Sequence, residues 1–298
     1  MENAVHPVQR LPAPWVLGAE SYMLFLRLRE LPRGLYDGLE EAWGDDGLGT
    51  FEGGLGAVVI VRYTDTPVGP YDELMLIPGN FSVPQPPNSP LKIPKKALRI
   101  ARIYVSQRTT TYNGRLNWNI PKHLARFSFS APATPRGAAP PKDLTVSVFP
   151  PGTEDGDAVQ PFFACRLTPW KYVPAVPVNM GWLPISTTHV QPPIPESAGH
   201  KRAVAAELQA QGRGAAVDPY DISSKNEVAV AVGTERWCAF GIGGRGRRAR
   251  GCWVEVLHNG AEVGEEKSYW PQGLRPWRFG GWIEDAVFEI EEPVEWKL

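Results

Sequence analysis

The sequence predicts a mainly antiparallel β fold of the α+β class, a closed or cone-like β-barrel with a few peripheral helices. Apolar runs of strand length recur between turn signals, and several of them alternate apolar and polar residues, as half-buried strands do. Helix signals are few, so strands do not alternate with long helices and a parallel α/β fold is disfavoured. Proline (31 residues) and glycine (30 residues), together with eleven tryptophans, indicate a turn-rich, well-packed chain.

The expected strands are rich in β-branched, aromatic or long apolar residues, and turn residues bound them. They are the segments 21–28, 55–63, 71–77, 99–107, 125–131, 143–149, 161–167, 227–233, 252–258 and 285–292. In the segment 71–77, alternation places Glu73 on the same face as Tyr71 and Met75. A carboxyl group at this position is therefore expected to lie against an apolar wall.

Helix and turn signals complete the list of elements. The segment 198–212 has the best helical pattern, with a glycine at its end as a stop signal, and 34–43 is a shorter candidate. Pro121 suits the first position of a single helical turn. Asn259-Gly260 and Asn113-Gly114 have the composition of two-residue hairpin turns.

Length and charge limit the classes of protein. The chain has 298 residues and is 43% hydrophobic, enough for a sizeable core. We expect a single domain over residues 1–298 that can include a helical insertion near 198–225. The formal net charge of −1 gives no global attraction to nucleic acid or to a membrane surface, and no apolar run approaches the length of about 18 residues that a membrane span needs. A soluble, cytoplasmic protein without a nucleic-acid or membrane partner is expected.

Cysteine and histidine patterns give no sign of a metal or another cofactor. Cys165, Cys238 and Cys252 form no CxxC pair, so a disulfide framework is not expected and a reducing compartment fits. The five histidines lack metal-ligand spacing, and no cofactor is expected. The glycine- and arginine-rich segment 241–251 lacks the ending of a phosphate-binding loop, and we interpret it as a basic hairpin loop.

One long window contains no acidic residue. From Leu74 to Lys142 there is no Asp or Glu, but there are eleven Lys and Arg residues. In one interpretation, acids from elsewhere in the chain fold back and neutralise this window. In the other, the window forms a locally positive pocket in which Lys122 loses its proton readily. A neutral amine is a nucleophile that attacks a ketone or aldehyde to form an imine.

Two motifs in this region resemble the acetoacetate decarboxylase-like superfamily, and in particular its larger, fungal-type members. In the first motif, Gly114-Arg115 is followed by LNWNI and then by Pro121-Lys122. The second motif is a turn that ends in Gly-X-Tyr-X-Glu, and it is found in the earlier segment VGPYDE (68–73). The order of the two motifs and the length of chain between them also match the family, and the resemblance covers roughly residues 55–130. It implies a cone-like β fold of this superfamily, with Lys122 as the imine-forming lysine and Glu73 as the acid beside it.

The sequence also departs from the decarboxylase pattern. His123 stands where the decarboxylase has a second lysine, and a histidine is mostly neutral near pH 7. The segment GAESYM lacks the arginine found before the first core strand, and the position of a second acid falls near Val58. These differences count against acetoacetate decarboxylation itself and leave Schiff-base chemistry open on a larger, more apolar substrate. The residues expected to bind it are Arg115, Trp118, Tyr71, Tyr112 and His123, with Arg115 either binding an anionic group or bracing the loop.

The leading hypothesis is an enzyme that acts on a small carbonyl compound through an imine at Lys122, with Glu73 as acid and base. Its reaction would be of the lyase type, a decarboxylation or an aldol-type carbon–carbon step, in specialised metabolism. Two alternatives stay open. One is a cyclase or isomerase that uses the same cavity without a covalent bond, and the other is a non-catalytic protein that binds a hydrophobic ligand. A homo-oligomer is neither required nor excluded by the sequence.

Overall fold

Strands dominate the structure. The computed structural model describes residues 6–44, 47–87, 90–182, 186–260 and 268–298. All sixteen strands in this part of the chain belong to one hydrogen-bonded sheet, which confirms the predicted mainly β fold. They are β1 (Trp15–Leu26), β2 (Phe51–Gly53), β3 (Gly56–Asp65), β4 (Tyr71–Ile77), β5 (Asn80–Ser82), β6 (Lys96–Leu98), β7 (Arg102–Val105), β8 (Lys122–Leu124), β9 (Arg126–Phe129), β10 (Leu144–Phe149), β11 (Phe163–Pro169), β12 (Val176–Asn179), β13 (Thr188–Gln191), β14 (Trp237–Asn259), β15 (Phe279–Ile290) and β16 (Val294–Trp296).

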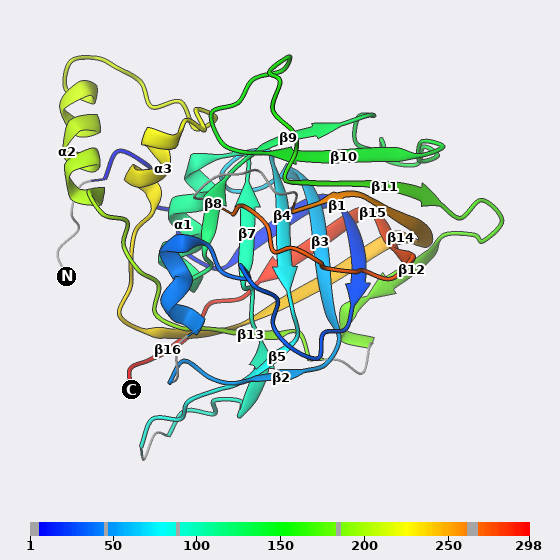
Figure 1. Ribbon diagram of the computed structural model, residues 1–298, viewed down its shortest axis with the longest axis horizontal. Coiled ribbons are helices and arrows are strands. Elements are labelled where there is room, and N and C mark those ends of the chain that lie inside the picture. Colours follow the sequence, from blue (N-terminus) through cyan, green and yellow to red (C-terminus); the bar gives the residue numbers. More distant parts are fainter. Residues whose placement is uncertain (1–5, 45–46, 88–89, 183–185, 261–267) are drawn as a thin grey trace.

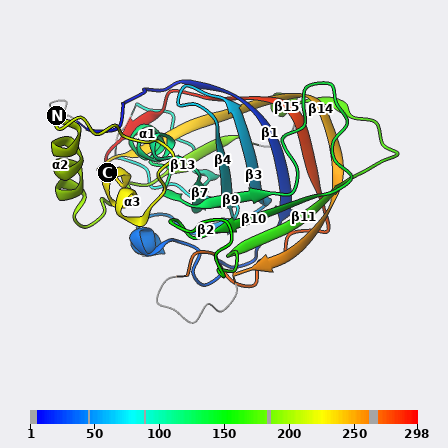
Figure 2. The ribbon, with the colours of Figure 1, turned by 90° about the horizontal axis from the view of Figure 1, so that it is seen from above.

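The helices gather at one end of the sheet, as Figures 1 and 2 show. They are α1 (Arg108–Trp118), α2 (His200–Gln211) and α3 (Ser224–Val230), and two short 3-10 turns are η1 (Gly38–Gly44) and η2 (Met180–Trp182). The helix predicted at 198–212 is confirmed as α2, and the candidate at 34–43 is the 3-10 turn η1. No helix in the described part of the chain is long and apolar enough to cross a membrane. The single-domain organisation stays a prediction.

The strands follow a strongly curved path (Figure 2), which runs in the order β9-β10-β11-β14-β15-β1-β3-β4-β7-β8. A branch of β2, β5, β6 and β13 joins the first part of β14. The two ends of the path, β8 and β9, are consecutive in the chain, yet no ladder of hydrogen bonds pairs them among the described residues. The predicted closed barrel is therefore not confirmed, although the fold is mainly β.

The β7-α1-β8 unit carries the motif that contains Lys122. β7 and β8 are parallel, with Ile103 opposite Lys122, and parallel neighbours need a crossover connection, here supplied by α1. The Gln107 side chain accepts a hydrogen bond from the Thr110 backbone N–H and caps the start of α1. Asn119 adopts a left-handed conformation (φ 54°) that ends the helix and turns the chain into β8.

Two apolar cores lie on opposite faces of the central strands. Leu74 and Leu76 of β4 pack into one core, while Tyr71 and Met75 pack into the other. Glu73 lies on the face of Tyr71 and Met75, as the predicted alternation requires, because successive side chains of a strand point to opposite faces. The face of β4 that holds Glu73 also receives Lys122, two strands away across β7.

Three local predictions from the sequence are wrong, and a fourth lies partly outside the described residues. The segment 227–233, predicted as a strand, lies largely in helix α3, because its buried Val230 packs beside α1 rather than in a ladder. Asn113-Gly114 lies inside α1 and is not a hairpin turn. The helical turn predicted at Pro121 is instead the start of strand β8. The turn predicted at Asn259-Gly260 continues into residues outside the described part of the chain.

The segment 241–251, predicted as a basic loop, lies in the middle of the long strand β14. Its arginines face acids on the neighbouring strand β15. Arg248 and Arg250 each contact Glu284, with N···O distances of 2.8 Å, and Arg245 contacts Glu289 at 2.6 Å. Opposite charges on adjacent strands stabilise the pairing of the strands. The basic character of this segment is therefore accounted for by cross-strand ion pairs.

Candidate active site

Lys122 is the first residue of β8, and its side chain points into the core that contains Glu73. The Lys122 Nζ donates to Glu73 Oε2 at 2.9 Å and to Thr110 Oγ1 at 2.8 Å. Both charged side chains are almost completely buried, with 4% of Lys122 and 3% of Glu73 exposed. A buried ion pair persists only with good geometry and additional hydrogen bonds, and Thr110 supplies one of these.

One face of α1 is shaped around the Lys122 side chain. Thr110, Gly114 and Trp118 are spaced four residues apart, so they lie along one side of the helix. A β-carbon at Gly114 would stand 2.7 Å from Lys122 Cδ and 2.8 Å from Cε. The glycine therefore leaves the space through which the aliphatic part of Lys122 passes to reach Glu73.

Two tyrosines complete the surroundings of Glu73. The Tyr63 hydroxyl donates to Glu73 Oε1 at 3.3 Å, and the Tyr71 ring lies with its centroid 5.0 Å from Lys122 Nζ. Burial, and then the Glu73 carboxylate, raise the pKa of Tyr63 and of Tyr71 well above the ordinary value. Both phenols therefore keep their protons, and Tyr63 donates its proton in a hydrogen bond to the carboxylate.

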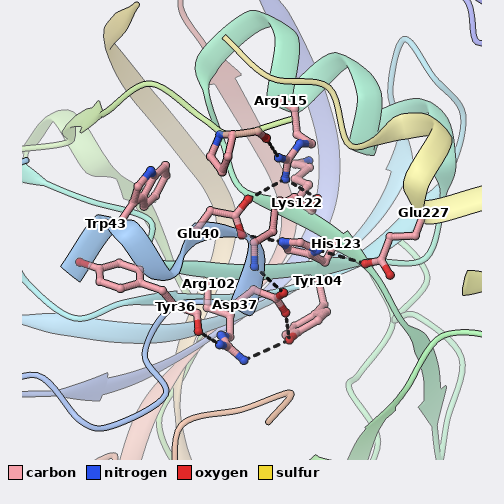
Figure 3. Close-up of polar contacts among 12 residues, drawn as sticks. Tyr36, Asp37, Glu40, Trp43, Arg102, Tyr104, Arg115, Lys122, His123 and Glu227 are labelled. Carbon is pink, nitrogen blue, oxygen red and sulfur yellow. Dashed lines mark hydrogen bonds and ion pairs between the residues drawn. The ribbon is translucent and has the colours of Figure 1, made fainter. Parts of the chain in front are cut away.

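A second buried polar cluster lies beside the first and includes the residue after Lys122 (Figure 3). Glu40 of η1 accepts from Arg115 Nη1 at 3.0 Å and contacts His123 Nε2 at 2.8 Å. The other ring nitrogen of His123 lies 3.0 Å from Glu227 Oε1, a residue of α3. Because consecutive residues of a strand point to opposite faces, His123 faces this cluster while Lys122 faces Glu73.

His123 is positively charged in this setting. Burial alone lowers the pKa of His123, but the charges of Glu40 and Asp37, and the hydrogen bonds that the ring donates to Glu227 and Glu40, raise it to about 10. Burial likewise opposes ionisation of Glu40, but His123 and Arg115 bring the pKa of that carboxyl below its ordinary value. The prediction that His123 is mostly neutral near pH 7 is therefore wrong, because the sequence did not reveal its acidic partners.

The other predicted binding residues lie in different places. Arg115 ties α1 to neighbouring segments of the chain and so has the bracing role of its two predicted roles. Besides Glu40, it donates to the carbonyl oxygens of Val232 at 3.0 Å and Pro195 at 2.7 Å, and its Nη1 lies 3.4 Å from the Lys122 carbonyl oxygen. Trp118 packs in the same apolar core as Tyr71.

Tyr112 and His123 are not in contact with the Lys122 amine. Tyr112 lies on another side of α1 from Thr110, where its ring stacks on His6 with the centroids 3.9 Å apart.

Three residues of the site, Thr110, Tyr63 and Glu40, were not predicted from the sequence. The pairing of Tyr63 with Tyr71 across β3 and β4 and the helical spacing of Thr110 become visible only in the fold.

Three of these groups also have the composition of a metal site. One ligand atom each of Asp37, Glu40 and His123 lies within 4.8 Å of the others. The imidazole of His123 is protonated at neutral pH and contacts carboxylates through both ring nitrogens, and Glu40 also pairs with Arg115. In the structure these residues form an ion-pair network.

Acids from outside the acid-free window neutralise six of its eleven cations. The ion pairs that do this are Lys96–Glu52, Arg108–Glu207, Arg115–Glu40, Lys122–Glu73, Arg126–Asp155 and Arg136–Asp285. In the described residues, the charged group in contact with the Lys122 amine is a carboxylate and not a cation. The interpretation in which distant acids fold back is the one that the structure favours.

Two of the cavities on the described part of the protein have volumes of about 410 Å³ and about 470 Å³. The first lies beside Leu116 and Asn117 near the end of α1, and the second beside Val178 and Arg245. Neither is lined by Lys122 or Glu73. Lys122 and Glu73 are almost completely buried, so a small molecule reaches the amine only when the side chains packed around it move.

Similar proteins were found through structure and not through sequence. No family model and no curated protein sequence matches the chain. Acetoacetate decarboxylase from Legionella pneumophila subsp. pneumophila str. Philadelphia 1 superposes with a TM-score of 0.57 at 8% identity, over 99% of this chain and 91% of that chain. A second acetoacetate decarboxylase structure gives a TM-score of 0.55 at 11% identity, over 97% and 91% of the two chains. The chain therefore has the acetoacetate decarboxylase fold.

Proposed function

We propose that this protein is an enzyme that forms an imine between Lys122 and the carbonyl group of a small molecule. One observation carries the proposal: a buried lysine whose Nζ lies 2.9 Å from a buried carboxylate. A nucleophilic lysine needs a base close enough to take its proton, and Glu73 is within hydrogen-bond distance. The acetoacetate decarboxylase fold supports an enzyme that acts on a carbonyl compound.

The arrangement accounts for each proton in imine formation. Glu73 takes a proton from the Lys122 ammonium, and the free amine attacks the carbonyl carbon while Glu73 returns that proton to the carbonyl oxygen. Glu73 then takes the second nitrogen proton and gives it to the departing hydroxyl group, which leaves as water. The products are a protonated imine, the Glu73 carboxylate and one water molecule, so the charge of the site is unchanged. The Thr110 hydroxyl, 2.8 Å from Nζ, orients the amine during these steps.

The protonated imine withdraws electrons from the adjacent carbon, and a bond to that carbon is then easier to break or form. A lyase reaction, either a decarboxylation or an aldol-type step with loss of water, follows from this chemistry. The Tyr63 and Tyr71 phenols, which stay protonated because of their raised pKa, are placed to donate hydrogen bonds to a developing negative charge. A place in specialised metabolism stays a prediction.

A non-covalent cyclase or isomerase is the second candidate. The observation that favours it is the set of acid and base groups around Glu73, because a carboxylate with a neighbouring phenol can move protons on a bound ketone without an imine. In that case Lys122→Met keeps part of the activity, whereas an imine enzyme loses all of it. A binding protein without catalytic activity would give no product, either as the unmodified protein or as Lys122→Met.

Exchange of a ketone oxygen with water tests the imine without knowledge of the natural substrate. Each cycle of imine formation and hydrolysis replaces the carbonyl oxygen by one from the solvent. In isotopically labelled water, we expect the protein to accelerate incorporation of the label into benzylacetone, and Lys122→Met to abolish the acceleration. The control is Lys96→Met, which removes a half-exposed lysine paired with Glu52. Equal acceleration by Lys122→Met and the unmodified protein would contradict the proposal.

A further inference from the structure

We infer that the carbonyl compound that reacts at Lys122 is a neutral, apolar ketone or aldehyde and carries no carboxylate. The inference rests on the proposed imine function and identifies its substrate class. Three features of the described residues support it: the charge balance of the buried pair, the commitment of the other buried cations to distant partners, and the aromatic surroundings of the amine.

The charges of Lys122 and Glu73 cancel inside the core. Their Nζ–Oε2 distance of 2.9 Å and their near-complete burial make them one neutral unit. A neutral ketone preserves this balance, because the protonated imine keeps the positive charge of the lysine. A keto acid would bring one more negative charge next to Glu73, and burying an unpaired charge costs several kcal/mol.

The other buried arginines are held by groups outside this site. Their principal partners are the Glu40 carboxylate for Arg115, backbone carbonyls of Leu35, Tyr36 and Ser268 for Arg102, Glu207 for Arg108, and the Leu48 carbonyl and the Phe81 ring for Arg99. In the described residues, none of these guanidinium groups donates a hydrogen bond to Glu73 or lies in contact with the Lys122 amine. Within the described part of the chain, no arginine therefore stands at the amine to pair with a substrate carboxylate.

The core into which the amine points is mainly apolar and aromatic. Tyr71 and Tyr63 lie with their ring centroids 4.5 Å apart, and Tyr63 lies 6.5 Å from Phe288. Trp118 and Met75 belong to the same buried core. Surroundings of this kind stabilise an apolar, ring-containing body on the carbonyl compound, because the apolar surface leaves water on binding.

A matched pair of compounds tests the inference. Benzylacetone and benzylpyruvate share the same phenylethyl ketone body and differ in a methyl group against a carboxylate. Both are added in equal amounts with cyanoborohydride, which reduces an imine to a stable amine by adding hydride to its carbon. Peptide mass spectrometry then gives the ratio of the two adducts at Lys122 and, as an internal reference, at the half-exposed Lys96. The reference ratio corrects for the different reactivity of the two carbonyl groups.

The ketone-to-keto-acid ratio at Lys122 is expected to exceed the ratio at Lys96 by about tenfold or more, which corresponds to about 1.4 kcal/mol. Equal ratios at the two lysines would overturn the inference and leave the imine function in place. Absence of both adducts at Lys122 would overturn the proposed function itself, and with it the inference.

Glu73→Gln gives a second test on the same ratio. The variant removes the negative charge, so a substrate carboxylate can then balance the protonated imine. The total amount of adduct falls because the base is lost, but the ratio at Lys122 is expected to move toward the Lys96 reference. An unchanged ratio in a variant with native circular dichroism would contradict the charge-balance argument.

Discussion

Lys122 Nζ and Glu73 Oε2 lie 2.9 Å apart in the core, although the two residues belong to strands separated by β7. The contact depends on three local features: the Thr110 hydroxyl that holds the amine, the missing side chain of Gly114, and the left-handed residue that ends α1. The spacing from Gly114-Arg115 to Pro121-Lys122 therefore meets a geometric requirement: the lysine side chain has to pass the glycine to reach Glu73.

Breaking the pair is expected to destabilise the fold more than replacing it. Glu73→Leu leaves the Lys122 ammonium buried without its counter-charge, and we expect a loss of about 3–5 kcal/mol in the free energy of unfolding. The double variant Lys122→Met, Glu73→Leu removes both charges and is expected to recover most of that loss. Urea unfolding measures both effects. A double variant that is as unstable as the sum of the single changes would show that the pair is not energetically coupled.

Gly114→Ala is expected to destabilise the protein, against the general helix preference. Alanine favours a helix interior over glycine by about 1 kcal/mol. Here the added β-carbon meets Lys122 Cδ at 2.7 Å, and the lysine is fixed at its tip by Glu73 and Thr110. Crowding of this kind costs about 1–3 kcal/mol.

The matched control for Gly114→Ala is Gly212→Ala at the end of α2, where the nearest atom to a β-carbon is 3.5 Å away. Thermal unfolding of the two variants is compared. A Gly114 variant that is more stable than the unmodified protein would contradict the described fit of α1 to Lys122.

The cluster around Glu40 is expected to be essential for stability. Glu40→Ala leaves Arg115 and His123 as buried cations, with an expected loss of about 3–5 kcal/mol. Glu255→Ala is the control, since that residue is 62% exposed and pairs with an exposed arginine. Exposed pairs contribute about 0–1 kcal/mol, so the control should change little. Chemical unfolding that gives equal losses for the two variants would refute the role of the cluster.

The protonation of His123 links this cluster to pH. Its folded pKa of about 10 lies above the ordinary value of 6.5, with Glu40, Asp37 and Glu227 facing the ring. The native state therefore holds a proton that the unfolded state releases between these values. The stabilisation is complete below pH 6.5 and is lost as the pH rises toward 10, with a slope of at most about 1.4 kcal/mol per pH unit.

His123→Gln does not titrate and isolates this contribution. The difference in unfolding free energy between the native protein and the variant is expected to shrink across that pH range. A difference that stays constant between pH 6.5 and 10 would mean that the buried imidazole is neutral.

Much of the β fold follows from the sequence. The segment 71–77 is observed as β4 with the predicted bounds, and its alternation places Glu73 on the face that also receives Lys122. Helix α1 could not be predicted, because it is rich in threonine and asparagine and its Asn113-Gly114 pair has the composition of a hairpin turn. Most of its side chains are buried by contacts that come from distant parts of the chain.

The state of His123 is hidden from the sequence for the same reason. Its partners Glu40 and Glu227 are 83 and 104 residues away along the chain. A charged histidine in the core requires those acids to meet, and only the fold brings η1 and α3 together around β8. The residues next to His123 in the sequence therefore indicate an ordinary pKa, whereas its protonation is set by tertiary contacts.

The most direct measurement of the central claim is the site of reductive trapping by benzylacetone and cyanoborohydride. The account predicts one dominant mass increase, on the peptide that contains Lys122, and its loss in Lys122→Met but not in Lys96→Met. Modification spread over exposed lysines, with Lys122 unmodified at saturating ketone, would contradict the claim that this buried lysine is the nucleophile.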